Sequence, residues 1–270
     1  MCRMSFITAI AQHSAAGSGM DSLLEAVESG QRPALATETL ITKKGPVKRA
    51  YYSAPEVDVP AGVSANVARR MSRLSKMFLH VAGQLFQQSS SEQNGAQASL
   101  RTGLIIGTAF STMELSRGFQ DSVHRSGSVG ASPTLFAGSV QNAIAAQVSL
   151  TYAIQGPCCT VMTMEQTVVD AFSMANAWIA EDRVDQVYVL LGDEYCQYNL
   201  YALMHLPEPP LLEPEKDDCT AIMGEGVAGF IISREASENA LCRIKSIEVF
   251  AESPPKSPRV FAASYGGFQQ

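Results

Sequence analysis

The segment from Gly156 to Glu194 constrains the fold more than any other part of the chain. It opens with Gly156-Pro157 and a short run of Cys, Thr, Val and Met, and a helix with apolar periodicity follows from about Thr167 to Ala180. The apolar run Val187–Leu191 then ends in Gly192-Asp193-Glu194, which is typical of a buried strand. The order is strand, tight turn, helix, strand. A tight turn between a strand and a helix is a place where enzymes can present a catalytic residue.

Helices and strands alternate along the rest of the chain, which favours one layer of an α/β sandwich. Residues 31–60 contain four prolines among mixed polar residues, so we expect an irregular surface excursion there. We expect two closing strands, the second antiparallel to the first. The predicted strands are Ser5–Ala11, Gly103–Ala109, Thr160–Met162, Val187–Leu191, Val227–Ser233 and Cys242–Phe250, and the predicted helices are Gly19–Ser29, Ser64–Phe86, Thr112–Val123, Pro133–Leu150 and Thr167–Ala180.

Four further segments, in this order, resemble β-ketoacyl synthases. They are Arg69–Lys76, Gly103–Thr108, Ser132–Asn142 and Met223–Ile232, and the last contains Gly224-Glu225-Gly226. With the 156–194 segment they extend the resemblance over roughly residues 4 to 250. The resemblance implies an α/β, thiolase-like layered sandwich that corresponds to the N-terminal half of a β-ketoacyl synthase. We expect residues 1–250 to form this single domain and residues 251–270 to form a C-terminal tail or arm.

The resemblance also locates the position of the missing nucleophile. β-Ketoacyl synthases carry a cysteine at the start of the helix after Gly-Pro, where the helix dipole stabilises a thiolate. Counting without gaps from Gly156-Pro157 or back from Asp185 places that cysteine at Glu165, and a slip of one residue places it at Gln166. None of the four histidines lies in a segment that matches the family's catalytic histidines. We therefore expect no catalytic residue for autonomous condensation.

The resemblance is strongest to truncated chain-length factors, as in aryl polyene and type II polyketide synthases. Such a subunit implies an active β-ketoacyl synthase as partner in a heterodimer, with an acyl carrier protein bound through the complex. Polyketide, polyene or fatty-acid-like biosynthesis is the expected setting. The implied channel residues are Phe110, Met113, Ser116, Phe119, Met162 and Met164, and the implied carrier-protein docking residues are Arg69, Arg70, Arg73 and Lys76. Core packing and a solvated helix face remain the simpler interpretations of these two sets.

A rival hypothesis makes the chain an enzyme in its own right. Burial could raise the pKa of the Glu165 carboxyl group so that it acts as a general acid or base. The reaction would be thioester hydrolysis or decarboxylation of a malonyl-carrier. However, no Gly-x-Ser-x-Gly motif occurs in the chain.

Composition excludes several other classes. The chain has 270 residues, a net charge of −6 and no apolar run of about 18 residues, which argues against nucleic acid binding and a membrane span. Gly224–Gly229 fits Gly-x-Gly-x-x-Gly, but an acidic loop precedes it and a strand follows, so it is not a dinucleotide site. The six cysteines show no metal-binding spacing and suit a reducing compartment. We expect a cytoplasmic protein without metal or cofactor.

Overall fold

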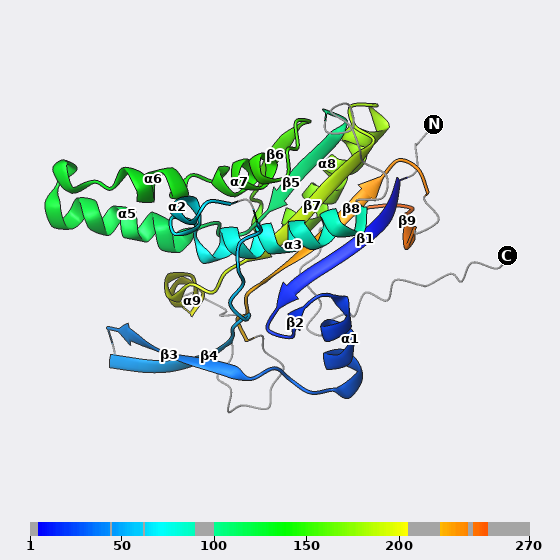
Figure 1. The fold of residues 1–270 in the computed structure, drawn as a ribbon. Coiled ribbons are helices and arrows are strands. Elements are labelled where there is room, and N and C mark those ends of the chain that lie inside the picture. Colours follow the sequence, from blue (N-terminus) through cyan, green and yellow to red (C-terminus); the bar gives the residue numbers. More distant parts are fainter. Residues whose placement is uncertain are drawn as a thin grey trace.

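The structure, a computed structural model, describes residues 5–43, 45–61, 63–89, 100–204, 222–236 and 240–247. Within these residues a seven-stranded sheet has the order β2-β1-β8-β7-β5-β6, and β9 also pairs with β1 (Figure 1). Strands β5, β6 and β7 are parallel, whereas β8 runs antiparallel to both β7 and β1. The strands are β1 (Ser5–Ser14), β2 (Gly17–Ser18), β5 (Thr102–Gly107), β6 (Cys158–Val161), β7 (Gln186–Asp193), β8 (Gly226–Ser233) and β9 (Cys242–Ile244).

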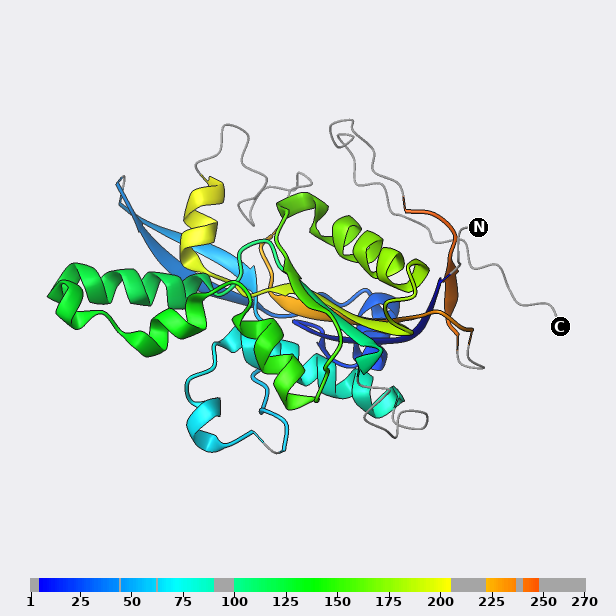
Figure 2. The ribbon, with the colours of Figure 1, turned by 90° about the horizontal axis from the view of Figure 1, so that it is seen from above.

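Helices cover both faces of this sheet (Figure 2). Successive side chains of a strand point to opposite faces, so β7 places Tyr188 and Leu190 in the core under α3 and α7, and Val187 and Val189 in the core under α8. The helices are α1 (Met20–Ser29), α2 (Ala65–Ala68), α3 (Arg73–Ser89), α5 (Met113–Ser126), α6 (Pro133–Ser139), α7 (Ala143–Thr151), α8 (Thr167–Ala180) and α9 (Gln197–Met204), with 3-10 turns η1 (Ser128–Gly130) and η2 (Met164–Gln166). The predicted α/β sandwich layer is confirmed.

The expected irregular excursion at residues 31–60 is wrong. Two strands, β3 (Leu35–Thr42) and β4 (Gly45–Tyr52), form an antiparallel ribbon there, with Leu40 opposite Val47. The prolines misled the prediction because they lie at the ends of the ribbon: Pro46 is the second residue of β4, and the others flank the pair. Proline is tolerated at such edge positions, and burial alternates along most of β3, as in a strand with one solvent-facing side.

Two predicted helices are each divided in two. The pattern from Ser64 to Phe86 becomes α2 and α3, because the hydroxyl of Ser72 accepts the amide hydrogen of Ser75 at 2.9 Å and so caps a new helix start. The pattern from Pro133 to Leu150 breaks at Val140, whose backbone is extended, and α7 restarts after Asn142. The apolar periodicity continues across both interruptions, so it did not predict them.

The closing strands do not form the predicted antiparallel pair. β8 already has β1 on one side and β7 on the other, so neither edge of β8 is open to β9. β9 instead pairs antiparallel with β1 through Ser5–Ile7, on the side of β1 away from β8. The predicted tail at residues 251–270 lies outside the described residues.

Helices α5 and α6 project from one end of the sheet as a helical pair, here called the α5–α6 arm (residues 113–139; Figures 1 and 2). Leu115 approaches Gly138, Gly118 approaches Leu135, and the rings of Phe119 and Phe136 lie 5.3 Å apart. Neither helix contains a buried residue. The arm is therefore held mainly by its own two helices.

Candidate functional site

The turn between β6 and α8 is the predicted position of the nucleophile. Met164 has φ 54°, in the left-handed region that a side chain rarely adopts, and the Thr163 amide donates to the hydroxyl of Thr167 at 3.1 Å. Glu165 and Gln166 follow as exposed residues at the N-terminus of α8, where helix amides lack intrahelical partners. A strained strand-to-helix turn is a known way to present a nucleophile. Here it presents a carboxylate and an amide.

The two neighbouring cysteines offer no substitute nucleophile. The prediction placed them before the strand, but β6 begins at Cys158, so both belong to the strand itself. Burial raises the pKa of the Cys158 thiol and raises that of Cys159 to about 11, with a further contribution from the Cys158 charge. A thiol must ionise to attack, so both are poor nucleophiles near neutral pH.

A half-buried carboxylate fixes the loop beside this turn. Asp193, at the end of β7, accepts hydrogen bonds from the Thr108 hydroxyl at 2.5 Å, the Ala109 amide at 2.8 Å and the Phe110 amide at 2.9 Å. Burial raises the pKa of Asp193, and these hydrogen bonds only partly oppose that rise. Asp193 therefore sets the direction in which the chain leaves β5 and enters α5.

The two groups of predicted channel residues follow strands that end side by side. β5 and β6 are parallel neighbours, and the Thr108 amide donates to the Val161 carbonyl at 3.1 Å. Residues directly after the two strands consequently lie at the same end of the sheet, beyond the C-terminal ends of β5 and β6. Phe110, Met113, Ser116 and Phe119 follow β5 and are all half-buried; Met162, also half-buried, and the exposed Met164 follow β6. Phe119 differs from the rest because its ring packs on Phe136 of α6.

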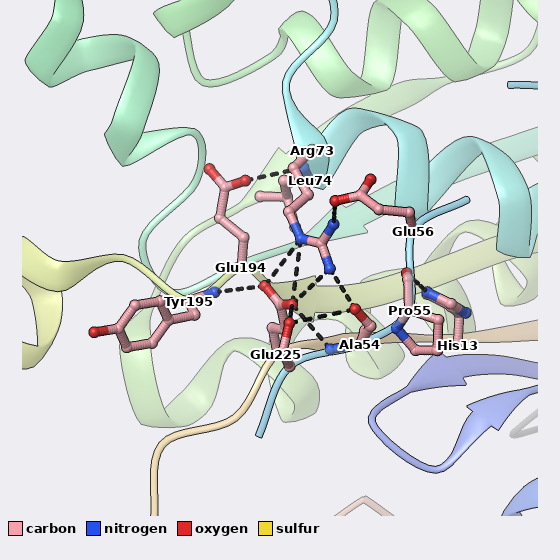
Figure 3. A network of polar contacts seen from close by, with 10 residues as sticks. His13, Ala54, Pro55, Glu56, Arg73, Leu74, Glu194, Tyr195 and Glu225 are labelled. Atoms are coloured by element: carbon pink, nitrogen blue, oxygen red, sulfur yellow. Dashed lines mark hydrogen bonds and ion pairs between the residues drawn. The ribbon is translucent and has the colours of Figure 1, made fainter. Parts of the chain in front are cut away.

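An ion-pair network at the start of α3 ties the β3–β4 ribbon to the sheet (Figure 3). The Arg73 guanidinium donates to Glu225 at 2.7 Å and also contacts Glu56 and the Ala54 carbonyl. Glu225, whose side chain is 2% exposed, also accepts from the Ala54 amide at 2.9 Å and the Tyr195 amide at 3.1 Å. Burial acts to raise the pKa of Glu225, but hydrogen bonds from Arg73 and Ser53 outweigh it and leave the pKa lowered.

This network separates Arg73 from the other predicted docking residues. Its guanidinium is engaged by Glu225 and Glu56 within the chain. Arg69 and Arg70 are exposed, and Lys76 is half-buried, one turn further along α3. Arg69 contacts Asn66 at 2.5 Å, within its own short helical segment. The four side chains lie close in sequence, but Arg73 has a structural role that the other three do not share.

A third carboxylate, Glu194, lies buried beside the network (Figure 3). One of its oxygens accepts the Leu74 amide at 3.0 Å, at the N-terminus of α3, while the other has no hydrogen-bond partner among the described residues. Burial raises the pKa of Glu194 to about 7, and the nearby charges of Glu114 and Glu225 act in the same direction. The protonated form is thus accessible at neutral pH.

The sequence indicated these carboxylates only as members of short motifs. Asp193 and Glu194 were part of the strand end, and Glu225 was part of a glycine-rich turn. A Cβ at Gly192 would approach the Gly226 carbonyl to 2.2 Å, so the glycines let the two backbones meet and bring Glu194 and Glu225 to the same region. The sequence signal was the pair of glycine–acid motifs, one after a strand and one before a strand.

Within the described ranges, no cluster of three or more His, Cys, Asp or Glu residues is arranged to hold a metal ion. The same residues contain no helix long and apolar enough to cross a membrane.

Comparison with known families identifies the class to which this fold and turn belong. Residues 60–237 match the family described as Beta-ketoacyl synthase, N-terminal domain. That match covers more than half of the chain, which belongs to this family. No curated protein matches the chain.

Solved structures share the fold at low sequence identity. The ketosynthase ApeO in complex with its chain length factor ApeC, from Xenorhabdus doucetiae, superposes with a TM-score of 0.69 at 19% identity, over 87% of this chain and 59% of the matched one. The ishigamide ketosynthase/chain length factor gives 0.67 at 17%, over 85% and 62%. A β-ketoacyl synthase from Burkholderia phymatum STM815 gives 0.66 at 19%, over 86% and 59%. The chain thus spans about three fifths of each of these structures.

Proposed function

We propose that this chain is a non-catalytic, chain-length-factor-like subunit that pairs with an active β-ketoacyl synthase. The observation that carries the proposal is the strained strand-to-helix turn at residues 163–167, which presents Glu165 and Gln166 where the resemblance implies a nucleophile. A member of the β-ketoacyl synthase family without a nucleophile at this turn can still shape the site of a partner. The resemblance to truncated chain-length factors and the ketosynthase/chain length factor neighbours support this role.

The edge strand β6 is the surface that we propose for pairing with the partner. β6 stands at the end of the strand order, so among the described strands it pairs only with β5. The Pro157 carbonyl accepts from the Leu104 amide of β5, and the Val161 carbonyl accepts from the Thr108 amide just after β5. Because backbone groups alternate in direction along a strand, Cys158 and Thr160 direct their amides away from β5. An open edge of this kind pairs readily with another strand.

The α5–α6 arm extends the proposed interface. Val129 at its tip is 97% exposed and Phe136 is 55% exposed, and neither helix contains a buried residue. Exposed apolar side chains grouped on one element mark an interaction surface. The arm and the turn after β6 flank the same end of the sheet, so a partner on this edge would contact both.

The acyl channel of the complex is proposed to run past residues at this same end. Phe110, Met113 and Ser116 lie after β5, and Met162 and Met164 lie after β6, so side chains from both segments could bound a chain growing from the partner's cysteine. Thioether side chains accommodate varied shapes. Phe119 is the most constrained candidate, because Phe136 already contacts it. We propose that the chain growing in this channel is a polyene of the aryl polyene type, in line with the resemblance to truncated chain-length factors.

Docking of an acyl carrier protein is proposed to involve Arg69, Arg70 and Lys76, with Arg73 acting through the Glu225 ion pair. Carrier proteins are acidic, and exposed basic side chains attract them at long range. With a net charge of −6, the chain as a whole does not favour this contact. The partner subunit would therefore supply most of the docking surface.

The alternative, an autonomous thioester hydrolase or malonyl-carrier decarboxylase that uses Glu165, has weaker support. A carboxylate that works as a general acid near neutral pH is usually buried so that its pKa rises. Glu165 is instead exposed.

The test is co-expression with a β-ketoacyl synthase encoded beside this chain, followed by size-exclusion chromatography with light scattering. We expect a one-to-one complex, with condensation that depends on this chain. Thr160→Pro removes an outward amide of β6 and should abolish the complex, whereas Thr160→Val keeps that amide and should preserve it. Separate elution of the wild-type chain, with thioester cleavage lost in Glu165→Ala, would replace the proposal with the hydrolase alternative.

A further inference from the structure

A serine and two histidines meet at the turn between β1 and α1, at the opposite end of the strand order from β6. The hydroxyl oxygen of Ser18 lies 2.6 Å from Nδ1 of His13 and 3.1 Å from Nε2 of His80. The two imidazole rings are 5.3 Å apart. Ser18 is exposed, whereas His13 is fully buried. This is the geometry of a hydroxyl nucleophile beside a positioned base.

The surroundings of His13 select the tautomer that can act as a base. Its Nε2 lies 2.9 Å from the Pro55 carbonyl oxygen, which can only accept a hydrogen bond. Neutral His13 must therefore carry its proton on Nε2, which leaves the Nδ1 lone pair facing Ser18. The carbonyl of Pro55 orients the ring as the third group of a catalytic triad does. Figure 3 shows this contact between His13 and Pro55.

The turn that carries Ser18 is rigid. Gly17 and Gly19 on either side have φ 109° and 86°, which residues with side chains rarely adopt. Ser14 and His13 pair with Gly17 and Ser18 in the β1–β2 register. The buried Gln12 side chain donates to the Gly19 carbonyl at 2.5 Å. The position of the Ser18 hydroxyl is thus fixed before any ligand arrives.

The first amides of α1 come shortly after Ser18, beyond the Gly19 amide, which donates to the Gln12 carbonyl at 2.9 Å. Helix α1 starts at Met20 with no side-chain cap, and the first amides of a helix have no intrahelical partner. Such amides, with the positive end of the helix dipole, stabilise an oxyanion. A serine, a base, an orienting acceptor and the uncapped first turn of a helix therefore occur within one turn and its immediate contacts.

We propose that this chain, which lacks a nucleophile for condensation at the turn after β6, carries a separate acyl-transfer site in which Ser18 and His13 react with activated acyl esters or thioesters. The Ser18 oxygen attacks the acyl carbonyl carbon while Nδ1 of His13 takes the hydroxyl proton. The carbon–oxygen or carbon–sulfur bond to the leaving group breaks, and His13 returns the proton to that group. The product is an acyl ester on Ser18, which water hydrolyses by the same proton transfers to release a carboxylic acid and regenerate the serine.

Burial and nearby charges keep the His13 imidazole neutral at physiological pH. Burial lowers the pKa of His13 and the Arg73 charge lowers it further, while the Pro55 hydrogen bond, Glu225 and Glu56 oppose this. Burial and the His13 charge also lower the pKa of His80. These are the titratable and charged groups that act on the pair from α3, from the start of β8 and from residues 55–56. Activity should therefore rise with pH through a midpoint below 6.5 and then stay level to pH 8.

The test uses the full chain, a fluorophosphonate probe with peptide mass spectrometry, and p-nitrophenyl butyrate hydrolysis. We expect one adduct, on Ser18, that is lost in Ser18→Ala, together with a fall in hydrolysis of at least about 100-fold, as for loss of a nucleophile or base. His13→Gln should lose both signals. Ser29→Ala changes an exposed serine at the other end of α1 and should behave as the wild type.

Three outcomes would overturn the proposal. One is a folded wild-type chain, judged by its melting transition, that takes up no probe. Another is an adduct elsewhere with unchanged hydrolysis in Ser18→Ala. The third is hydrolysis without the expected pH dependence, since that would show that His13 is not the base. If His13→Gln fails to fold, Ser18→Ala alone still decides, because Ser18 lies at the surface.

Discussion

Helix α3 and the α5–α6 arm show two different ways in which this chain uses apolar residues. α3 has 17 residues and eight of them are buried, including Leu74, Phe78 and Leu85, each fully enclosed. α5 has 14 residues, and none of them is buried. Both helices are amphipathic, so the difference lies in what each one packs against.

The comparison indicates where the chain's own stability resides. Burial of a large apolar side chain contributes about 1.5–3 kcal/mol, and the α3 face of the sheet contains most of the fully buried large residues. The arm contributes little of this kind, yet exposes Val129 and Phe136. The arm's apolar residues are therefore available to a partner, whereas those of α3 belong to the fold.

Replacing one phenylalanine of α3 and one of the α5–α6 arm with alanine should give the largest difference in stability between the two regions. Phe78→Ala should lower the free energy of unfolding by about 3–5 kcal/mol, because it leaves a cavity in a closed core. Phe119→Ala removes a half-buried ring that contacts Phe136 on the arm, and should cost about 1 kcal/mol. Urea titration followed by circular dichroism measures both values. Equal losses would show that the arm is as much a part of the core as α3.

Breaking the Arg73–Glu225 pair should have the next largest effect. Arg73→Met leaves the buried Glu225 carboxylate without its countercharge, which costs about 3 kcal/mol or more. Arg69→Met is the matched control, because Arg69 is exposed and its loss should change stability by less than about 0.5 kcal/mol. If the two variants unfold at the same denaturant concentration, Arg73 does not anchor the β3–β4 ribbon to α3.

Glu194 makes the α3 side sensitive to pH. Its pKa is raised to about 7 in the folded chain against 4.5 as the ordinary value, so folding stability should fall as pH rises from 4.5 to 7 and then remain level. Glu194→Gln removes this dependence while its side-chain oxygen can still accept the Leu74 amide. We expect Glu194→Gln to gain about 1–3 kcal/mol relative to the wild type between pH 5 and pH 8.

At pH 5 the stabilities of Glu194→Gln and the wild type should be similar, because Glu194 is already protonated in the folded state. Melting curves of the wild type and Glu194→Gln at pH 5 and at pH 8 measure the difference in stability between the two proteins. Identical pH dependence of the two proteins would show that Glu194 is ionised in the folded chain throughout.

Local patterns predicted the elements that lie on the core. α8 begins at Thr167 and ends at Ala180 as predicted, and β5 and β7 contain their predicted apolar runs, because periodicity follows directly from burial. The β3–β4 ribbon was missed, since its strands are half-exposed and its prolines resemble loop signals. Resemblance, rather than spacing, supplied the overall architecture.

The polar site could not have been predicted from local pattern at all. Arg73 and Glu225 are 152 residues apart in sequence, and Ser18 meets His80 from a different element. The sequence indicated Arg73 only as a possible docking residue, Glu225 only as part of a glycine-rich motif, and His80 only as a histidine outside the matching segments. Only the order of strands in the sheet brings them together, and that order is a property of the whole chain.

Hydrogen exchange provides the finest test of the contrast between α3 and the arm. Amides of α3 should exchange only through global unfolding, whereas α5 amides should exchange by local opening and so be far less protected in the chain alone. Adding the proposed β-ketoacyl synthase partner should slow α5 and leave α3 unchanged, because only the arm gains new packing. If α5 is already protected as strongly as α3 without a partner, the arm is stable by itself and its exposed phenylalanine is no evidence for an interface. If both helices slow together on complex formation, the partner stabilises the whole fold, and the division between a self-sufficient body and a partner-dependent arm fails.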